Sequence, residues 1–114
     1  MQSQFRLEVG SEGRATLIVV RGELDLASGP ELEAELARVH ERPPEMLIID
    51  LSQLDFMDST GLSILVKAHQ QTVEDGREFG VVRGTPQVQR LLELTGVSER
   101  LPMADSPEEL IAGG

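Results

Sequence analysis

The chain has 114 residues, of which 39% are hydrophobic and 26% are charged, so it is long enough for a single domain over residues 1–114 with its own apolar core. The absence of cysteine excludes disulfides and thiolate chemistry, and a formal net charge of -10 argues against binding to nucleic acid or to an anionic membrane. No apolar run is long enough to span a bilayer, and the N-terminus does not resemble a secretory signal, so we expect a cytoplasmic protein.

The first predicted elements are two strands. Residues 4–9 alternate apolar and polar side chains, which is the period of a half-buried strand, and residues 15–20 form a second, β-branched strand. Residues 10–13 contain two glycines and predict a turn between them, so we expect an N-terminal β-hairpin. Residues 21–25 are then expected to leave the sheet.

A helix is predicted next, from about Ser28 to the proline pair that begins at Pro43. Residues 46–51 are almost continuously apolar, which is typical of a central strand covered on both faces. Apolar residues then recur at helical spacing from Leu62 to Val73, which predicts a second helix.

Strands and helices continue to alternate in the last third of the chain. Its sequence pattern predicts a strand over 79–82, a helix between residues 85 and 96, an edge strand at 101–103 and a short helix that begins near Ser106. Strands and helices that alternate after a hairpin favour an α/β fold, with a mixed β-sheet of about four to five strands and helices packed on it.

The turn between the central strand and the second helix has two interpretations. In the structural one, Asp58 caps the helix while Ser59 and Thr60 occupy its first turn; such a cap stabilises a helix by about 1 kcal/mol. In the functional one, Ser59 holds its hydroxyl out at the helix N-terminus, where a partner enzyme can modify it. The apolar pair Phe56–Met57 would give that partner a rim, and Gly61, a poor helix former, would let another backbone approach.

Motifs of catalysis are sparse. The chain has no glycine-rich phosphate loop, no dinucleotide fingerprint and no nucleophile elbow. His40 and His69 are isolated, and we expect structural roles for both; without cysteine, no recognisable metal-ligand spacing remains, so no metal or cofactor is expected. Asp55 and Asp58 leave one enzymatic alternative, a small acid–base hydrolase that uses two carboxylates.

The same residues resemble those of STAS domains, and in particular those of the small bacterial anti-sigma factor antagonists. The resemblance covers nearly the whole chain and implies a STAS-type mixed β-sheet. It is carried by four stretches: Ile48-Ile49-Asp50-Leu51-Ser52, Phe56-Met57-Asp58-Ser59-Thr60-Gly61-Leu62, Gly22-Glu23-Leu24-Asp25, and residues 88–97.

The resemblance implies a function in binding rather than catalysis. In this family the antagonist binds an anti-sigma factor, a serine kinase of histidine-kinase-like ATPase fold, and so frees a sigma factor that controls responses such as stress response or sporulation. The kinase phosphorylates the antagonist on the serine after the motif's aspartate, the complex separates, and a metal-dependent phosphatase restores the active form. On this chain the implied phosphorylation site is Ser59, with Thr60 as the neighbouring, less favoured hydroxyl.

We expect the partner-binding surface to combine this turn with the loop after the second strand, in a protein that is a monomer or a weak dimer. For the aspartate in that loop, a role as a turn residue is an open alternative. Two other roles for a STAS domain also stay open, as an accessory subunit of a lipid transporter and as a scaffold in a stress-sensing assembly. The predicted partner-binding residues are Asp25, Phe56, Met57, Asp58, Ser59, Thr60 and Gly61.

Overall fold

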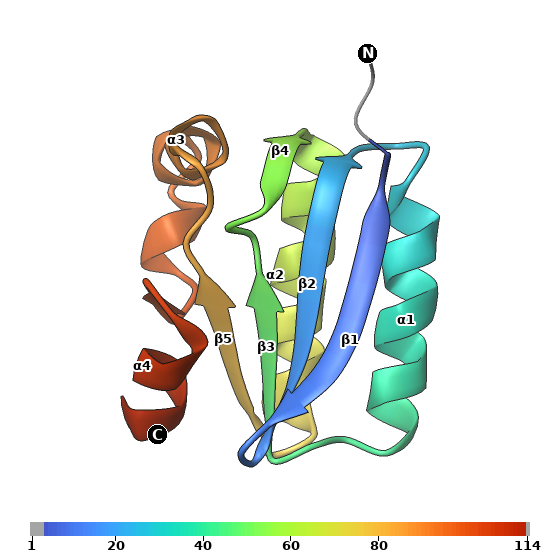
Figure 1. The fold of residues 1–114 in the computed structure, drawn as a ribbon, viewed down its shortest axis with the longest axis vertical. Helices are drawn as coiled ribbons and strands as arrows, with labels where there is room; N and C mark the ends of the chain where they lie inside the picture. The colour runs from blue at the N-terminus through green and yellow to red at the C-terminus, as the bar shows by residue number, and fades with distance from the viewer. Residues whose placement is uncertain (1–3, 114) are drawn as a thin grey trace.

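The computed structural model describes residues 4–113. Strands and helices alternate along this part of the chain, as the sequence predicts (Figure 1). The elements are β1 (Arg6–Glu12), β2 (Ala15–Leu24), α1 (Gly29–Glu41), β3 (Met46–Asp50), β4 (Leu54–Met57), α2 (Ser59–Glu74), β5 (Glu78–Val82), α3 (Pro86–Leu94), a 3-10 helix η1 (Val97–Glu99), β6 (Met103–Ala104) and α4 (Pro107–Gly113).

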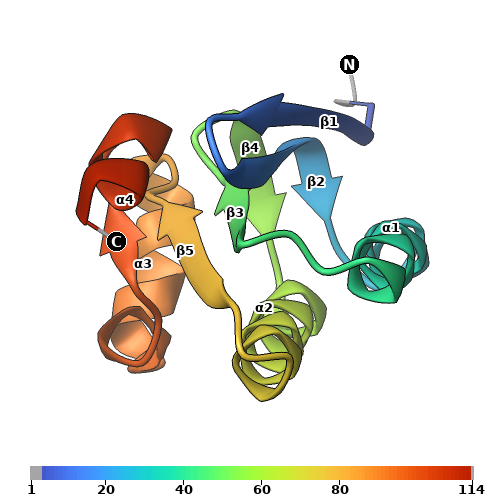
Figure 2. The same cartoon turned by 90° about the horizontal axis from the view of Figure 1, so that it is seen from below.

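The strands form one mixed sheet in the order β1-β2-β3-β5-β6, with β4 pairing to β2 outside this path. β1 and β2 are antiparallel, and all the other pairs are parallel. Figure 2 shows α1 and α2 on one side of the sheet and α4 on the other. The predicted α/β fold with an N-terminal hairpin is therefore confirmed, and the short strand β4 is added to it.

The central strand β3 is covered on both faces, as its continuous apolar pattern predicts. Leu47 and Ile49 face a core built with α1, α2 and α3. Met46 and Ile48 belong to a second core on the opposite face, where Leu110 of α4 is buried. Alternate side chains of a strand point to opposite faces, so this one strand supplies both cores.

Two predictions about the hairpin strands are wrong. β1 continues through Glu12, which pairs with Ala15, so the turn is at Gly13 and Arg14 and not over 10–13. Gly13 has a φ of 59°, which suits a tight hairpin turn. β2 does not leave the sheet at residue 21 but runs to Leu24, because β4 adds to its end.

The later elements follow the sequence pattern closely. The predicted edge strand is β6, which is displaced by two residues from its expected start because the backbone N–H of Leu101 bonds to the carbonyl oxygen of Val97 in η1. The final helix α4 begins at Pro107, one residue after the expected start. Within residues 4–113, no helix has both the length and the hydrophobicity to cross a membrane.

Candidate partner-binding site

The candidate site lies at the end of the sheet where β2 and β4 stop side by side. Leu24 and Met57 are partners in this parallel pair, and the backbone N–H of Asp58 donates to the carbonyl oxygen of Leu24 at 3.2 Å. The β2–α1 loop and the start of α2 leave the sheet together at this end (Figure 1). A Cβ placed on Gly29 would lie 3.2 Å from Cγ2 of Thr60, so the N-termini of α1 and α2 are also in contact.

Asp58 caps α2, which confirms the structural interpretation of the turn. Its backbone is extended, with a φ of -107° and a ψ of -169°, and its Oδ1 accepts the backbone N–H groups of Thr60 at 2.8 Å and Gly61 at 3.4 Å. Ser59 is the first residue of the helix and is exposed, whereas Thr60 is half-buried. The cap therefore fixes the backbone that carries an exposed serine, and the two interpretations of the turn are compatible.

The predicted apolar rim is only half present. Phe56 is 38% exposed, but Met57 is 4% exposed and belongs to the main core. Gly61 is also buried: a Cβ at this position would overlap Cγ of Met57 and would lie 2.9 Å from Cδ2 of Leu24. The prediction that Met57 and Gly61 form exposed partner contacts is therefore wrong. The small residue admits the Met57 side chain, not the backbone of another protein.

Asp25 organises the β2–α1 loop. Its Oδ1 accepts the backbone N–H groups of Ala27 at 3.0 Å and Ser28 at 3.1 Å. The Ser28 hydroxyl donates to the carbonyl oxygen of Glu23 at 2.7 Å and accepts the N–H of Asp25 at 3.0 Å. The hydrogen bond from the Ser28 N–H is the main reason that the pKa of Asp25 lies below its ordinary value of 3.8. The structure thus gives Asp25 the turn role left open by the sequence, and a partner contact stays a prediction.

Sequence reasoning missed Leu26, which the same loop exposes. Its side chain is 78% exposed, the largest value among the exposed large hydrophobic residues of the described chain. The signal in the sequence is a single leucine between Asp25 and Ala27, in a loop that otherwise holds small and polar residues. Local pattern does not decide which way such a leucine points.

The two carboxylates of the hydrolase alternative have different surroundings. Asp58 uses its Oδ1 as a helix cap, and Asp55 is exposed in β4. Among residues 4–113, no hydrogen bond joins these two side chains, and no cluster of three or more histidine, aspartate or glutamate side chains could hold a metal ion.

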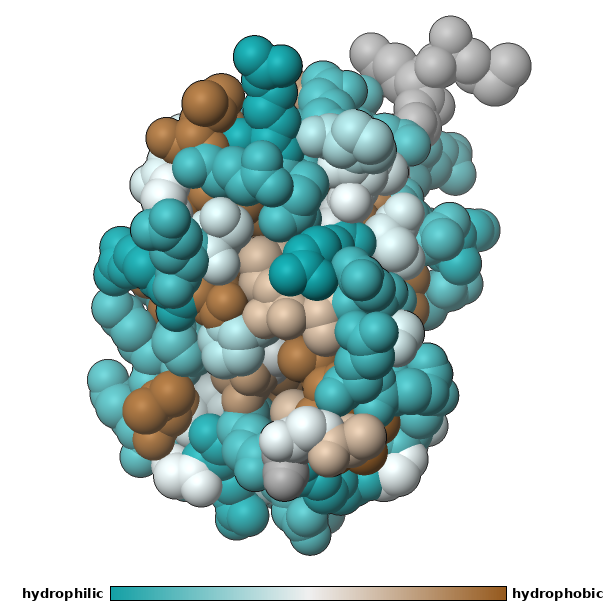
Figure 3. Space-filling view, turned by 90° about the vertical axis from the view of Figure 1, so that its left-hand side faces the viewer, coloured by the Kyte–Doolittle hydropathy of each residue, from teal (hydrophilic) through white to brown (hydrophobic). Residues whose placement is uncertain are grey.

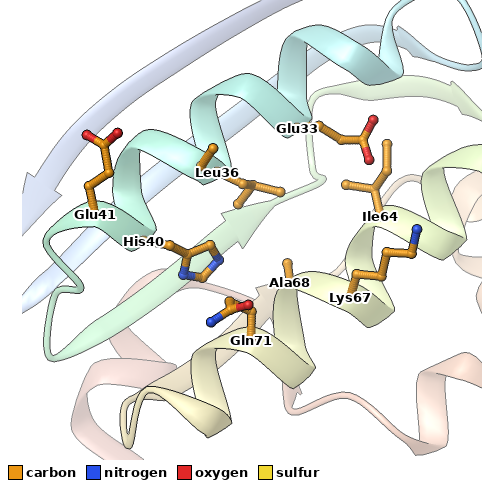
Figure 4. A pocket seen from close by; sticks show the side chains of 9 residues that line it. Glu33, Leu36, His40, Glu41, Ile64, Lys67, Ala68 and Gln71 are labelled. Carbon is orange, nitrogen blue, oxygen red and sulfur yellow. The ribbon is translucent and has the colours of Figure 1, made fainter.

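The two histidines lie away from the turn. His40 lines a groove of about 490 Å³ between α1 and α2, where its ring points between the helices (Figure 4). Its Nδ1 is 3.2 Å from Oδ2 of Asp75, so it connects the C-terminal ends of the two helices. The ring of His69 lies 5.3 Å from that of Phe79, centroid to centroid. Both arrangements fit the structural roles expected from the sequence.

The side of the molecule that carries α3 and α4 has hydrophobic residues in separate patches among hydrophilic ones (Figure 3). A second groove, of about 420 Å³, is lined by residues of β5, β6 and α4, including Phe79, Met103 and Leu110. Neither groove is lined by a residue of the Ser59 turn.

A model of the STAS domain family matches residues 6–110. The chain belongs to the STAS domain family. It is 28% identical over 105 residues to an anti-sigma F factor antagonist of Paenibacillus polymyxa, with 90% of each chain covered. It is 26% identical over 104 residues to an anti-sigma-B factor antagonist of Staphylococcus aureus, with 91% of this chain and 96% of the relative covered.

Solved structures of STAS proteins have the same architecture. An anti-sigma factor antagonist from Mycobacterium paratuberculosis superimposes with a TM-score of 0.89 at 28% identity, covering 96% of this chain and 93% of that one. The antagonist SpoIIAA in its unphosphorylated form gives a TM-score of 0.75 at 21% identity, covering 95% and 93%. The phosphorylated form of SpoIIAA gives a TM-score of 0.69 at 20% identity, covering 96% of this chain and 97% of that one. The predicted STAS-type sheet is confirmed, and the likeness to SpoIIAA concerns the fold alone.

Proposed function

We propose that this chain is an anti-sigma factor antagonist that binds a serine-kinase anti-sigma factor and is switched off by phosphorylation of Ser59. Membership of the STAS family and the names of the relatives support a regulatory binding protein rather than an enzyme. One structural observation carries the choice of site: Ser59 is exposed at the first position of α2, on a backbone fixed by the Asp58 cap.

The reaction at the site is a simple exchange of groups. The kinase transfers the terminal phosphoryl group of ATP to Oγ of Ser59, which loses its proton, and ADP leaves. A metal-dependent phosphatase then uses water to release inorganic phosphate and restore the hydroxyl. Thr60 is the poorer acceptor, because it is half-buried and its methyl group faces Gly29.

Electrostatics explains how the phosphate would end binding. It adds about -1.5 to -2 charges beside Asp58, whose Oδ1 already occupies the N–H groups of Thr60 and Gly61. The phosphate must therefore either compete with the Asp58 carboxylate for these N–H donors or project into the solvent. In either case a partner surface fitted to the neutral turn meets an added anion, and each loss of about 1.4 kcal/mol weakens binding tenfold.

The switch needs no refolding. The first turn of α2 packs on the core through Gly61, which lies against the side chains of Met57 and Leu24. Phosphorylation of Ser59 changes none of these three residues. SpoIIAA, solved in unphosphorylated and phosphorylated forms, has this fold in both. We place the protein in the cytoplasm, because the proposed partners use ATP and a sigma factor. A monomer or a weak dimer stays a prediction from the sequence.

The test is incubation with the cognate kinase and ATP, followed by mass spectrometry of the modified residue. We expect phosphate on Ser59, persistent binding of the kinase by Ser59→Ala, and poor binding by Ser59→Asp. Ser63→Ala is the matched control, because Ser63 is an exposed serine one turn further along α2. Binding of Ser59→Asp equal to that of the parent would contradict the switch, and phosphate on Thr60 alone would contradict the site.

A further inference from the structure

We propose that Leu26 is the apolar anchor of the partner-binding surface, and that it enters an apolar recess with a basic rim on the anti-sigma factor. The inference rests on the proposed function, and it assigns a binding role to a residue outside the phosphorylated turn. Four features of the described structure support it: the position of Leu26, its exposure on an ordered loop, its neighbours and its charge environment.

Leu26 lies beside the phosphorylated turn. Leu24 and Met57 are paired across parallel strands, which are about 4.8 Å apart in any sheet, and each chain then continues for two residues to reach Leu26 and Ser59. The contact between Gly29 and Thr60 joins the two segments again just beyond these residues. A protein interface covers about 800 Å² on each partner, an area large enough to include both Ser59 and Leu26.

The loop that carries Leu26 has an ordered backbone. The N–H groups of Ala27 and Ser28 both bond to Oδ1 of Asp25, and the Ser28 hydroxyl bonds to the carbonyl oxygen of Glu23. These bonds fix the backbone on both sides of Leu26, whose side chain is 78% exposed. Binding through a residue on an ordered loop costs less backbone conformational entropy than ordering a flexible loop would, which favours Leu26 as an anchor.

A second apolar side chain stands near this surface. Phe56 is 38% exposed and pairs with Glu23 in the β2–β4 ladder, three residues before Leu26. A single exposed leucine is common on protein surfaces, but an exposed phenylalanine in the strand that leads to Ser59 offers the same partner a second apolar contact.

Carboxylates surround this apolar surface. Asp25 and Asp58 are half-buried within it, and three further acidic side chains near it are exposed. An apolar side chain with acidic neighbours fits an apolar recess with a basic border on the partner. A basic partner surface is also favoured by the net charge of -10 on this chain. The three exposed residues are Glu23, Glu31 and Asp55.

The experiment measures binding of the parent and three variants to the cognate kinase by titration calorimetry, with the kinase loaded with a non-hydrolysable ATP analogue so that Ser59 is not phosphorylated during the titration. Leu26→Ala should weaken binding tenfold or more, while Leu26→Met, which keeps an apolar side chain of similar size, should stay within about threefold of the parent. Val73→Ala is the control: Val73 is 57% exposed on the same helix as Ser59, but about 21 Å further along its axis. It should bind like the parent.

A fourth variant tests the basic border. Leu26→Lys places a cation against it and should bind more weakly than Leu26→Ala, with the difference shrinking at high salt. Binding of Leu26→Ala within twofold of the parent, or an equal loss in Val73→Ala, would overturn the inference. These outcomes are separate from the proposed function, which is tested by the binding of Ser59→Asp and by the position of the phosphate. Unchanged thermal midpoints identify the losses as effects on binding, because position 26 is outside the core.

Discussion

The backbone N–H of Asp58 bonds to the carbonyl oxygen of Leu24, at 3.2 Å, and so joins two segments that are separated by more than thirty residues in the chain. Leu24 leads into the loop that carries the exposed Leu26, and Asp58 leads into the first turn of α2, which carries the exposed Ser59. The bond is a property of the sheet, because it extends the pairing of β2 with β4 by one residue. A surface assembled from this loop and this helix turn can therefore be presented in one fixed geometry.

Gly61→Ala should destabilise the protein by about 1–2 kcal/mol. Alanine gains up to about 1 kcal/mol of helix propensity, but its Cβ overlaps the side chain of Met57 and approaches Leu24, and overpacking costs about 1–3 kcal/mol. Urea denaturation of the parent and the variant measures the difference. Adding Met57→Ala should make the double variant lose less than the sum of the two single changes. A Gly61→Ala protein as stable as its parent would contradict this prediction, because it would mean that Met57 and Leu24 move aside at no cost.

Asp58→Ala should lower the free energy of unfolding by about 1 kcal/mol, because the N–H groups of Thr60 and Gly61 lose their acceptor. Asp58→Asn keeps an acceptor oxygen and should retain most of the stability. Both are measured by urea denaturation at neutral pH. If Asp58→Ala is as stable as the parent, the cap contributes nothing to the free energy of unfolding, and water satisfies the N–H groups of Thr60 and Gly61 equally well.

The β2–α1 loop should respond to acid through Asp25. Its pKa in the folded protein lies below the unfolded value of 3.8, so its ionised form stabilises the folded state. This stabilisation is complete above pH 3.8 and is lost as the pH falls through the lower, folded pKa. Asp25→Asn keeps the oxygen acceptor but not the charge. We expect the stability difference between parent and variant to be constant at neutral pH and to shrink below pH 3.8; a difference that does not change with pH would contradict this.

Phosphorylation of Ser59 should leave the fold unchanged. The helix N-terminus favours an anion by about 0.3–1 kcal/mol, and repulsion from Asp58 opposes this gain, so the net change in unfolding free energy should stay under about 1 kcal/mol. Far-UV circular dichroism and urea denaturation of the phosphorylated and unmodified protein measure it, with Ser59→Ala as the uncharged reference. A loss of helical signal on phosphorylation would mean that the switch melts α2.

Much of the fold follows from the sequence because its patterns are local. The β-branched run in β2, the continuous apolar run in β3 and the helical spacing after Leu62 each specify one element without reference to the rest of the chain. The cap at Asp58 is local as well, since its side chain bonds to N–H groups two and three residues away.

The features that the sequence did not predict depend on contacts between distant segments. β4 is only four residues long, and it becomes a strand because the end of β2 pairs with it. The same pairing decides that Met57 is buried and leaves the Leu26 loop outside the sheet. Both residues are apolar neighbours of aspartates in short connections, so local pattern cannot separate them.

The arrangement of β3 has a consequence for unfolding. Its four buried residues point alternately to the two faces, so both layers of the interior depend on one central segment. Neither layer can come apart while the other stays whole, and we expect denaturation in a single concerted transition, without a half-melted intermediate. A change at the protein surface can then alter binding without passing through a partly unfolded state.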